Sequence, residues 1–159
     1  MANSRTSTSR RSSLQLAALG VGGVFLLVGV LGFIPGVVAD YDTLAWSGHH
    51  SEARLFDLFQ VSVLHNIVHL LFGLVGIVAA RTTPAARAYL VGGGFIYLAL
   101  SVYGLIIDRA SDANFVPVNT ADNWLHLGLG LAMVALGLLL PQLSPTQTRG
   151  RHYRPGLTH

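Results

Sequence analysis

Three histidines and one aspartate stand out because they interrupt long apolar segments. The segment VLHNIVHLLFG carries His65 and His69 four positions apart, and in TADNWLHLGLG Asp122 precedes His126 by the same spacing. Side chains four residues apart lie on one face of a helix, so each pair can chelate one ion. Three imidazoles and one carboxylate suit Zn²⁺, and also Cu²⁺, Fe²⁺ or Ni²⁺. The pattern predicts a metal site formed by His65, His69, Asp122 and His126.

The same residues admit three other interpretations. His69 and His126 could hold a b-type haem between two helices as its axial ligands. The cluster could instead be structural glue, that is, a set of interhelical hydrogen bonds that each stabilise the bundle by about 1 kcal/mol in lipid. Asp122 and the histidines could also handle protons or sense pH, because imidazole titrates near neutrality. The neighbouring polar residues expected in a second shell are Asn66, Asn123, Tyr97 and Ser101.

The elements that must position these residues are membrane helices. The chain has 159 residues, of which 52% are hydrophobic and only 11% charged, with 18 glycines, and this balance is typical of a helical membrane protein. Cysteine is absent, which excludes disulfides, thiolate metal sites and cysteine nucleophiles. No nucleophile elbow or catalytic carboxylate pair is present either, so we expect a protein that is not an enzyme.

Four segments reach the roughly 20 apolar residues that a membrane-spanning helix needs. They cover residues 14–38, 61–80, 88–107 and 123–140 of a transmembrane domain at 14–141. Outer loops are expected at 39–60 and 108–122, and disordered cytoplasmic tails at 1–13 and 142–159. Within the first outer loop, RLFDLF predicts a short amphipathic helix lying on the membrane surface.

The charged residues predict how the chain is oriented. Arginines precede the first helix, lie between the second and third, and follow the fourth, whereas every acidic residue falls in the alternate segments. Arginine-rich flanks stay in the cytoplasm, so both termini are expected there, in a multi-pass protein of the plasma membrane. The formal net charge of +3 then requires no nucleic acid. The expected partners are the lipid bilayer and a larger membrane complex or further copies of the chain.

The second and fourth helices repeat one another. QVSVLHNIVHLLFG aligns without a gap on PVNTADNWLHLGLG, which pairs His69 with His126 and His65 with Asp122. The first and third helices align more loosely through their glycines. The chain is therefore predicted to be a helical hairpin duplicated in tandem about an axis along the membrane normal.

Each helix also carries a stripe of small residues spaced three or four apart. In membranes such stripes allow helices to pack closely, with polar groups turned inward. The fold predicted is an all-α, compact bundle of four transmembrane helices with a polar cluster in its outer half. The glycines expected at the helix contacts are Gly22, Gly29, Gly32, Gly36, Gly73, Gly76, Gly93, Gly104, Gly130 and Gly137.

Four stretches resemble a known family: LLVGVLGFIPG, LFQVSVLHNIVHLLFG, YLVGGG and NFVPVNTADNWLHLGLG. The family consists of small four-helix membrane proteins common in actinobacteria and is labelled only as a domain of unknown function. The resemblance covers about residues 14–140 and includes the histidines, asparagines and aspartate of both motifs. It implies the four-helix topology and an actinobacterial plasma membrane, and it implies no particular activity.

Overall fold

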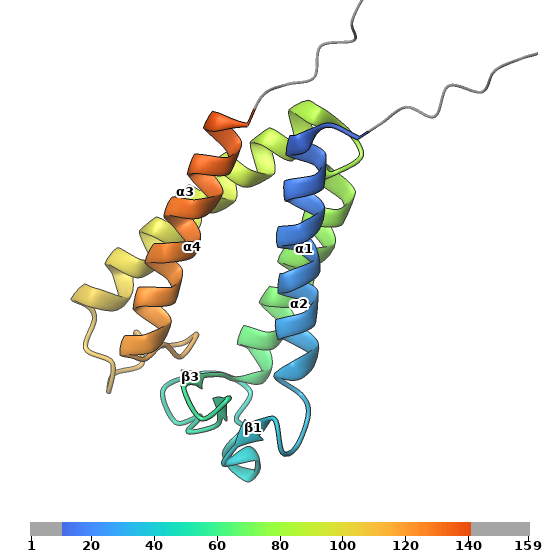
Figure 1. The fold of residues 1–159 in the computed structure, drawn as a ribbon. Coiled ribbons are helices and arrows are strands. Elements are labelled where there is room, and N and C mark those ends of the chain that lie inside the picture. Colours follow the sequence, from blue (N-terminus) through green and yellow to red (C-terminus); the bar gives the residue numbers. More distant parts are fainter. Residues whose placement is uncertain (1–10, 141–159) are drawn as a thin grey trace, which may run out of the picture.

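The computed structural model describes residues 11–140, which fold into four long helices with a small sheet at one end (Figure 1). The helices are α1 (Ser13–Leu31), α2 (Val63–Ala79), α3 (Thr83–Ile106) and α4 (Thr120–Leu139). The prediction of four helices is confirmed. The predicted tails at 1–13 and 142–159 fall almost entirely outside the described residues.

Each helix begins at a capping side chain. Ser12, Ser62, Thr82 and Asn119 each accept a hydrogen bond from the backbone N–H three residues further on. α3 begins earlier than the predicted residue 88 because Thr82 caps it and proline is favoured in a first turn. α4 begins before the predicted residue 123 because Asn119 and the side chain of Asp122 form a capping box.

The first helix is shorter than predicted. α1 ends at Leu31 rather than at residue 38, with Gly32 as its C-cap. Pro35 lacks a backbone N–H and cannot continue a helix, and Gly36 adopts a φ of 88°, a conformation that favours glycine. A Cβ on Gly36 would have no atom within 4 Å apart from those of its chain neighbours. Gly36 is therefore a turn residue and not a helix-packing glycine.

The loop between α1 and α2, predicted as the first outer loop, contains regular structure that was not predicted. Strands β1 (Val38–Ala39), β2 (Arg54–Leu55) and β3 (Phe59–Gln60) pair antiparallel in the order β1-β2-β3. The predicted surface helix at RLFDLF is therefore wrong, because β2 and β3 form a hairpin there. Phe56 and Asp57 reverse the chain with φ values of 54° and 56°. Arg54 forms an ion pair with Asp57 of this turn at 2.7 Å and another with Asp40, which follows β1, at 3.0 Å.

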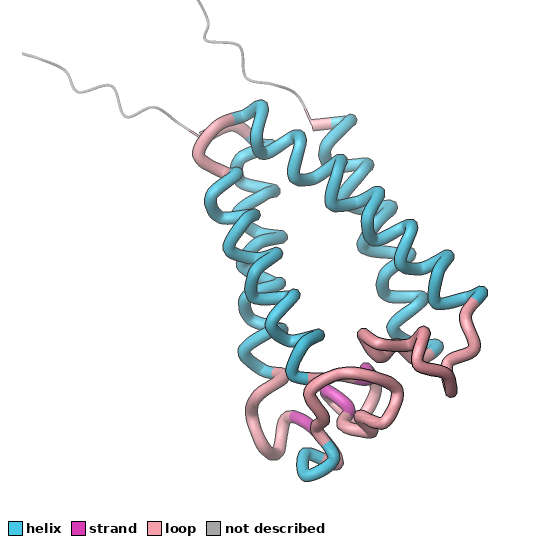
Figure 2. Tube along the Cα trace, turned by 180° about the vertical axis from the view of Figure 1, so that it is seen from behind, coloured by secondary structure: helices cyan, strands magenta, loops and turns pink. Residues whose placement is uncertain are grey.

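The helices are arranged as two hairpins. α1 packs mainly against α2, and α3 mainly against α4, with fewer contacts between the pairs. The hairpins come together at the end that carries the α2–α3 connection and diverge toward the sheet (Figures 1 and 2). Buried aromatic residues, among them Phe25, Tyr89 and Tyr97, belong to the core that the hairpins share.

Close glycine contacts join the two helices of each hairpin. A Cβ on Gly22 would lie 2.9 Å from the carbonyl oxygen of Gly73, and a Cβ on Gly94 would lie 2.8 Å from that of Gly130. A Cβ would similarly collide with another helix at nine of the ten glycines expected at helix contacts, Gly36 being the exception. The small-residue stripes therefore lie where the helices approach most closely.

The outward faces of the helices are apolar. Within residues 11–140, α1, α3 and α4 are long and apolar enough to cross a membrane, and α2 is a shorter apolar helix of 17 residues. At 1.5 Å per residue α2 is about 25 Å long, close to the lower limit for a span. Large side chains such as Leu27, Leu71 and Leu131 are more than half exposed. Apolar surface of this extent is suited to contact with lipid.

Candidate metal centre

Equivalent caps place the polar residues at the N-terminal ends of α2 and α4. The Ser62 hydroxyl accepts a hydrogen bond from the backbone N–H of His65 at 3.1 Å, and the Asn119 side chain accepts one from that of Asp122 at 3.0 Å. His65 and Asp122 therefore occupy the same position in the first turn of their helices. His69 and His126 follow one helical turn deeper, on the same faces.

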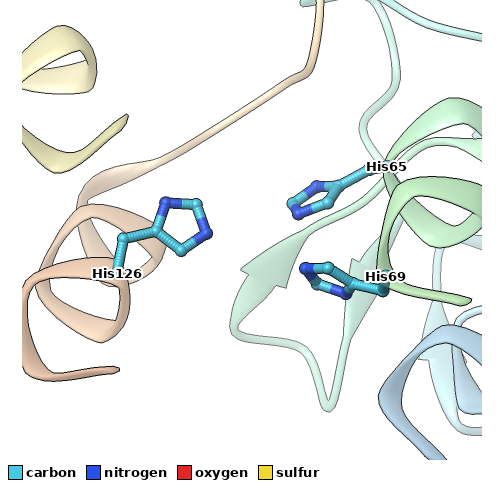
Figure 3. A group of neighbouring side chains, drawn as sticks. All are labelled: His65, His69 and His126. Atoms are coloured by element: carbon cyan, nitrogen blue, oxygen red, sulfur yellow. The ribbon is translucent and has the colours of Figure 1, made fainter. Parts of the chain in front are cut away.

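Three histidines from these two helices converge (Figure 3). His65 and His69 project from α2 toward His126 on α4, and each of the three offers a ring nitrogen within 4.8 Å of the others. The ring centroids of His65 and His69 are 4.5 Å apart, and those of His65 and His126 are 6.2 Å apart. The histidines are only 4%, 8% and 4% exposed in chain order, so the group is buried between the hairpins.

The spacing is close to that of a metal site. Three imidazoles that bind Zn²⁺ tetrahedrally at about 2.0–2.1 Å have their nitrogens roughly 3.4 Å apart. Side-chain movements of about an ångström would bring the three rings to this distance, because they already face one another. Three nitrogen ligands would leave one tetrahedral position open, as in zinc sites that bind a further ligand.

Each of the three rings has one buried nitrogen without a hydrogen-bond partner among the described residues. This nitrogen is Nδ1 in His65, His69 and His126 alike. An unpaired buried polar group costs about 1–3 kcal/mol, so three of them in one place would be a considerable penalty. A shared ion bound through the Nδ1 atoms would offset this penalty.

Asp122, the fourth predicted ligand, is not one of this close group. Its Oδ2 atom accepts hydrogen bonds from the backbone N–H of Asn119 at 2.8 Å and of Gln60 at 3.1 Å. Gln60 belongs to β3, so this carboxylate links the first outer loop to α4. The structure thus brings together three of the four predicted ligands and places the fourth in a cap.

The predicted second-shell asparagines lie within the hairpins. Asn66 donates to the carbonyl oxygen of Gly32 at 2.6 Å, and a Cβ on Gly32 would overlap the Asn66 amide. The side chain of Asn123 also lies against Gly104, but its amide has no hydrogen-bond partner among the described residues. The hydroxyl of Ser101 donates to the backbone carbonyl of Asn123 at 3.0 Å. These residues hold α1 to α2 and α3 to α4.

Aromatic rings form the floor of the histidine group. Tyr97 lies 5.1 Å from His126 between ring centroids, and Phe25 lies 5.6 Å from His69. Tyr97 was expected from the sequence, whereas Phe25 was not. The signal for Phe25 was available, because it is the counterpart of Tyr97 when the first and third helices are aligned on their glycines.

Together these features define a class: a four-helix protein with membrane-type helices and a buried three-histidine group between two helical hairpins. A family model described as Domain of unknown function (DUF4383) matches residues 15–139. The chain belongs to this family, as the sequence resemblance predicted. Comparison with curated proteins and with solved structures gives no match.

Proposed function

We propose that this protein is a multi-pass plasma-membrane protein that holds one transition-metal ion between its two hairpins through His65, His69 and His126. The observation that carries the proposal is the convergence of three buried imidazoles whose Nδ1 atoms lack partners among the described residues. Nitrogen ligands favour Zn²⁺, Cu²⁺ or Fe²⁺ over Mg²⁺ or Ca²⁺.

A cytoplasmic location of both termini is supported by where the charges lie on the fold. Arg11 precedes α1, Arg81 lies in the α2–α3 connection and Arg87 lies near the start of α3. These segments are at one end of the molecule (Figure 1). Asp40, Asp42, Glu52 and Asp57 lie at the end that carries the sheet. Retention of arginine on the cytoplasmic side would place the sheet and the histidine group toward the outside.

A tandem duplication of the hairpin accounts for contacts that occur twice. In one hairpin Gln15 donates to the carbonyl of Ala80 at 3.0 Å, and at the aligned positions of the other Arg87 donates to that of Gly137 at 3.0 Å. The contacts repeated in the same manner are Gly22–Gly73 and Gly94–Gly130, Gly32–Asn66 and Gly104–Asn123, and Phe25–His69 and Tyr97–His126. Two copies of one hairpin, facing each other, would bring ligands from both to one centre.

A single ion fits the geometry better than haem. With His69 and His126 as axial ligands, a porphyrin would need a flat space between them. The ring of His65 lies 4.5 Å from that of His69 and 6.2 Å from that of His126, so it occupies this region. A third imidazole is an additional ligand for an ion and an obstruction for a macrocycle.

The competing function is a structural or accessory protein in which the histidines act as interhelical glue. Polar residues with a structural role in this bundle make hydrogen bonds between helices: Asn66 and Ser101 each donate one to the neighbouring helix of their hairpin. The Nδ1 atoms of the three histidines make no such bond within residues 11–140. The convergence of the three rings, together with their unpaired Nδ1 atoms, is the reason for preferring an ion.

The test is the metal content of untagged protein purified in mild detergent without chelators, measured by elemental mass spectrometry. We expect about one equivalent of zinc, copper or iron, lost in the triple variant His65→Gln, His69→Gln, His126→Gln. The control is His49→Gln, His50→Gln, which removes two histidines from the outer loop and should keep the metal. Folded protein that neither contains nor takes up a metal, or that loses it only in the control, would overturn the proposal.

A further inference from the structure

Two cavities flank the three histidines. One, of about 110 Å³, lies among α2, α3 and the loop before α4, and the other, of about 120 Å³, lies among α1, α4 and the first outer loop. His65, His69 and His126 line both cavities. A ligand in either one would therefore lie against the imidazoles that form the proposed centre.

The remaining walls are almost wholly apolar. Leu100, Val116 and Val118 contribute to the first cavity, and Val24, Val28 and Leu125 contribute to the second. The one acidic side chain in either lining is Asp122, whose Oδ2 already accepts two backbone hydrogen bonds. A charged solute would lose its hydration on entering such a space, and the walls themselves would supply no counter-charge.

The cavities are bordered by side chains that face the bilayer. Val24 is 54% exposed and Leu125 is 40% exposed beside the second cavity, and Leu100 is 40% exposed beside the first. All three lie on helices apolar enough to cross a membrane. Access between α1 and α4, or between α2 and α3, would therefore lead from lipid.

Loops cover the site on the side that would face water. The first outer loop is bonded to the second half of the chain by Gln60 N–H to Asp122, and by the Asn119 amide to the Leu58 carbonyl at 2.7 Å. A third link is the backbone bond from Gly48 to the carbonyl of Phe115 at 2.7 Å. These bonds make the aqueous route the more obstructed one.

We propose that the metal held by the three histidines binds a small, uncharged molecule that is dissolved in the bilayer and carries one lone-pair donor atom. This inference rests on the proposed function, because three protein ligands leave a coordination position for such a donor. A cavity of about 150 Å³ is known to admit benzene, so these cavities suit molecules of a few heavy atoms. A small anion would be attracted by the charge of the metal, but it would have to leave water and pass apolar walls to reach it.

The experiment uses the full chain, loaded with Co²⁺ as a visible reporter and embedded in lipid nanodiscs. Methyl isocyanide serves as the neutral probe and azide as the anionic probe of similar size, and each is titrated against the cobalt absorption bands. We expect the isocyanide to change the spectrum at a concentration at least tenfold lower than azide does. Equal responses to both, or a response to azide alone, would overturn the inference.

Blocked cavities give a second test. The pair Val28→Trp, Leu100→Trp places a large ring in each cavity, and the matched pair Leu27→Trp, Val102→Trp places rings on exposed positions that line neither. We expect the first pair to weaken the isocyanide response at least tenfold and the second to leave it unchanged. Unchanged binding in the first pair would contradict access through these cavities.

The two proposals fail in different ways. Absence of cobalt absorption in folded wild-type protein would refute the metal site itself. Cobalt absorption that responds to neither probe would leave the metal site standing and refute the ligand. The cobalt spectrum before ligand addition also reports whether each tryptophan variant retains an intact centre, and the comparison of the two probes on wild-type protein requires no variant.

Discussion

The rings of Phe25 and Tyr97 lie 5.2 Å apart between centroids, where the two hairpins meet, and each also contacts a histidine of its own hairpin. The pair separates the histidine group from the deeper core, where Phe72 packs against both rings. The position of the histidines thus depends on packing between hairpins as well as on the helices that carry them.

Removal of the Phe25 ring is predicted to destabilise the protein and to weaken metal binding by the histidines. Phe25→Ala should destabilise the protein by about 3–5 kcal/mol, the usual range for a buried Phe→Ala change, and should weaken metal binding because His69 loses a supporting ring. Thermal unfolding and competitive metal titration would measure the two effects. Phe25→Leu is the control that keeps most of the apolar volume, and a Phe25→Ala protein with unchanged metal affinity would show that the ring does not position His69.

Neighbouring glycines on α1 are predicted to respond in opposite directions. Gly22→Ala should destabilise by about 1–3 kcal/mol, because its Cβ would lie 2.9 Å from the backbone of Gly73. Gly23→Ala should be neutral or stabilise by up to about 1 kcal/mol, because no atom lies within 4 Å of its Cβ and alanine favours helix. Thermal unfolding in one detergent compares them, and equal effects would argue against the close α1–α2 contact.

Asp122 is predicted to act as a cap and loop anchor. Asp122→Ala should cost about 0.5–2 kcal/mol, the range for loss of a capping side chain, and should free the first outer loop near Gln60. The variant should still bind one equivalent of metal through the three histidines. Loss of the metal from a variant whose melting temperature is unchanged would instead place Asp122 among the ligands.

Added metal is predicted to stabilise the protein by mass action. At 100 times its dissociation constant, a metal that binds only the folded state adds about 2.7 kcal/mol, and a chelator should reverse the gain. The melting temperature of the wild type should rise with Zn²⁺, whereas that of the triple His→Gln variant should not. A rise of equal size in both would place the zinc elsewhere on the chain.

The absence of cysteine makes the proposed topology directly testable. Ala113→Cys lies in the exposed loop before α4, and Pro84→Cys lies in the exposed first turn of α3. A membrane-impermeant maleimide applied to intact cells should label Ala113→Cys and should reach Pro84→Cys only after lysis. The reverse pattern would contradict cytoplasmic termini.

The helices and the histidine group were largely predictable, because both depend on local pattern. Apolar length indicated four helices, and the four-residue spacing with the aligned motifs indicated that His65, His69 and His126 share a centre. The end of α1 could not be placed as reliably. Its apolar character continues past Leu31, and only the conformation of Gly36 and the position of Pro35 show where the helix stops.

The outer loop and the role of Asp122 depend on contacts that no local pattern records. Strands of two residues have too little sequence to show an alternation. The β2–β3 hairpin turns at Phe56 and Asp57, and although Asp is enriched at positive φ, Phe is not. Asp122 has the spacing of a ligand, but it accepts a hydrogen bond from Gln60, which is distant in the sequence. Phe25 carries no signal of its own on an apolar helix, and only its alignment with Tyr97 in the repeat could have indicated it.

The most direct test of the three-histidine centre is X-ray absorption at the zinc K-edge on protein loaded with one equivalent of Zn²⁺. The account predicts three imidazole nitrogens at about 2.0–2.1 Å, with the outer-shell scattering of histidine rings, and loss of this signal in the triple His→Gln variant. A first shell with fewer than three imidazoles, or the same spectrum in the variant, would contradict it.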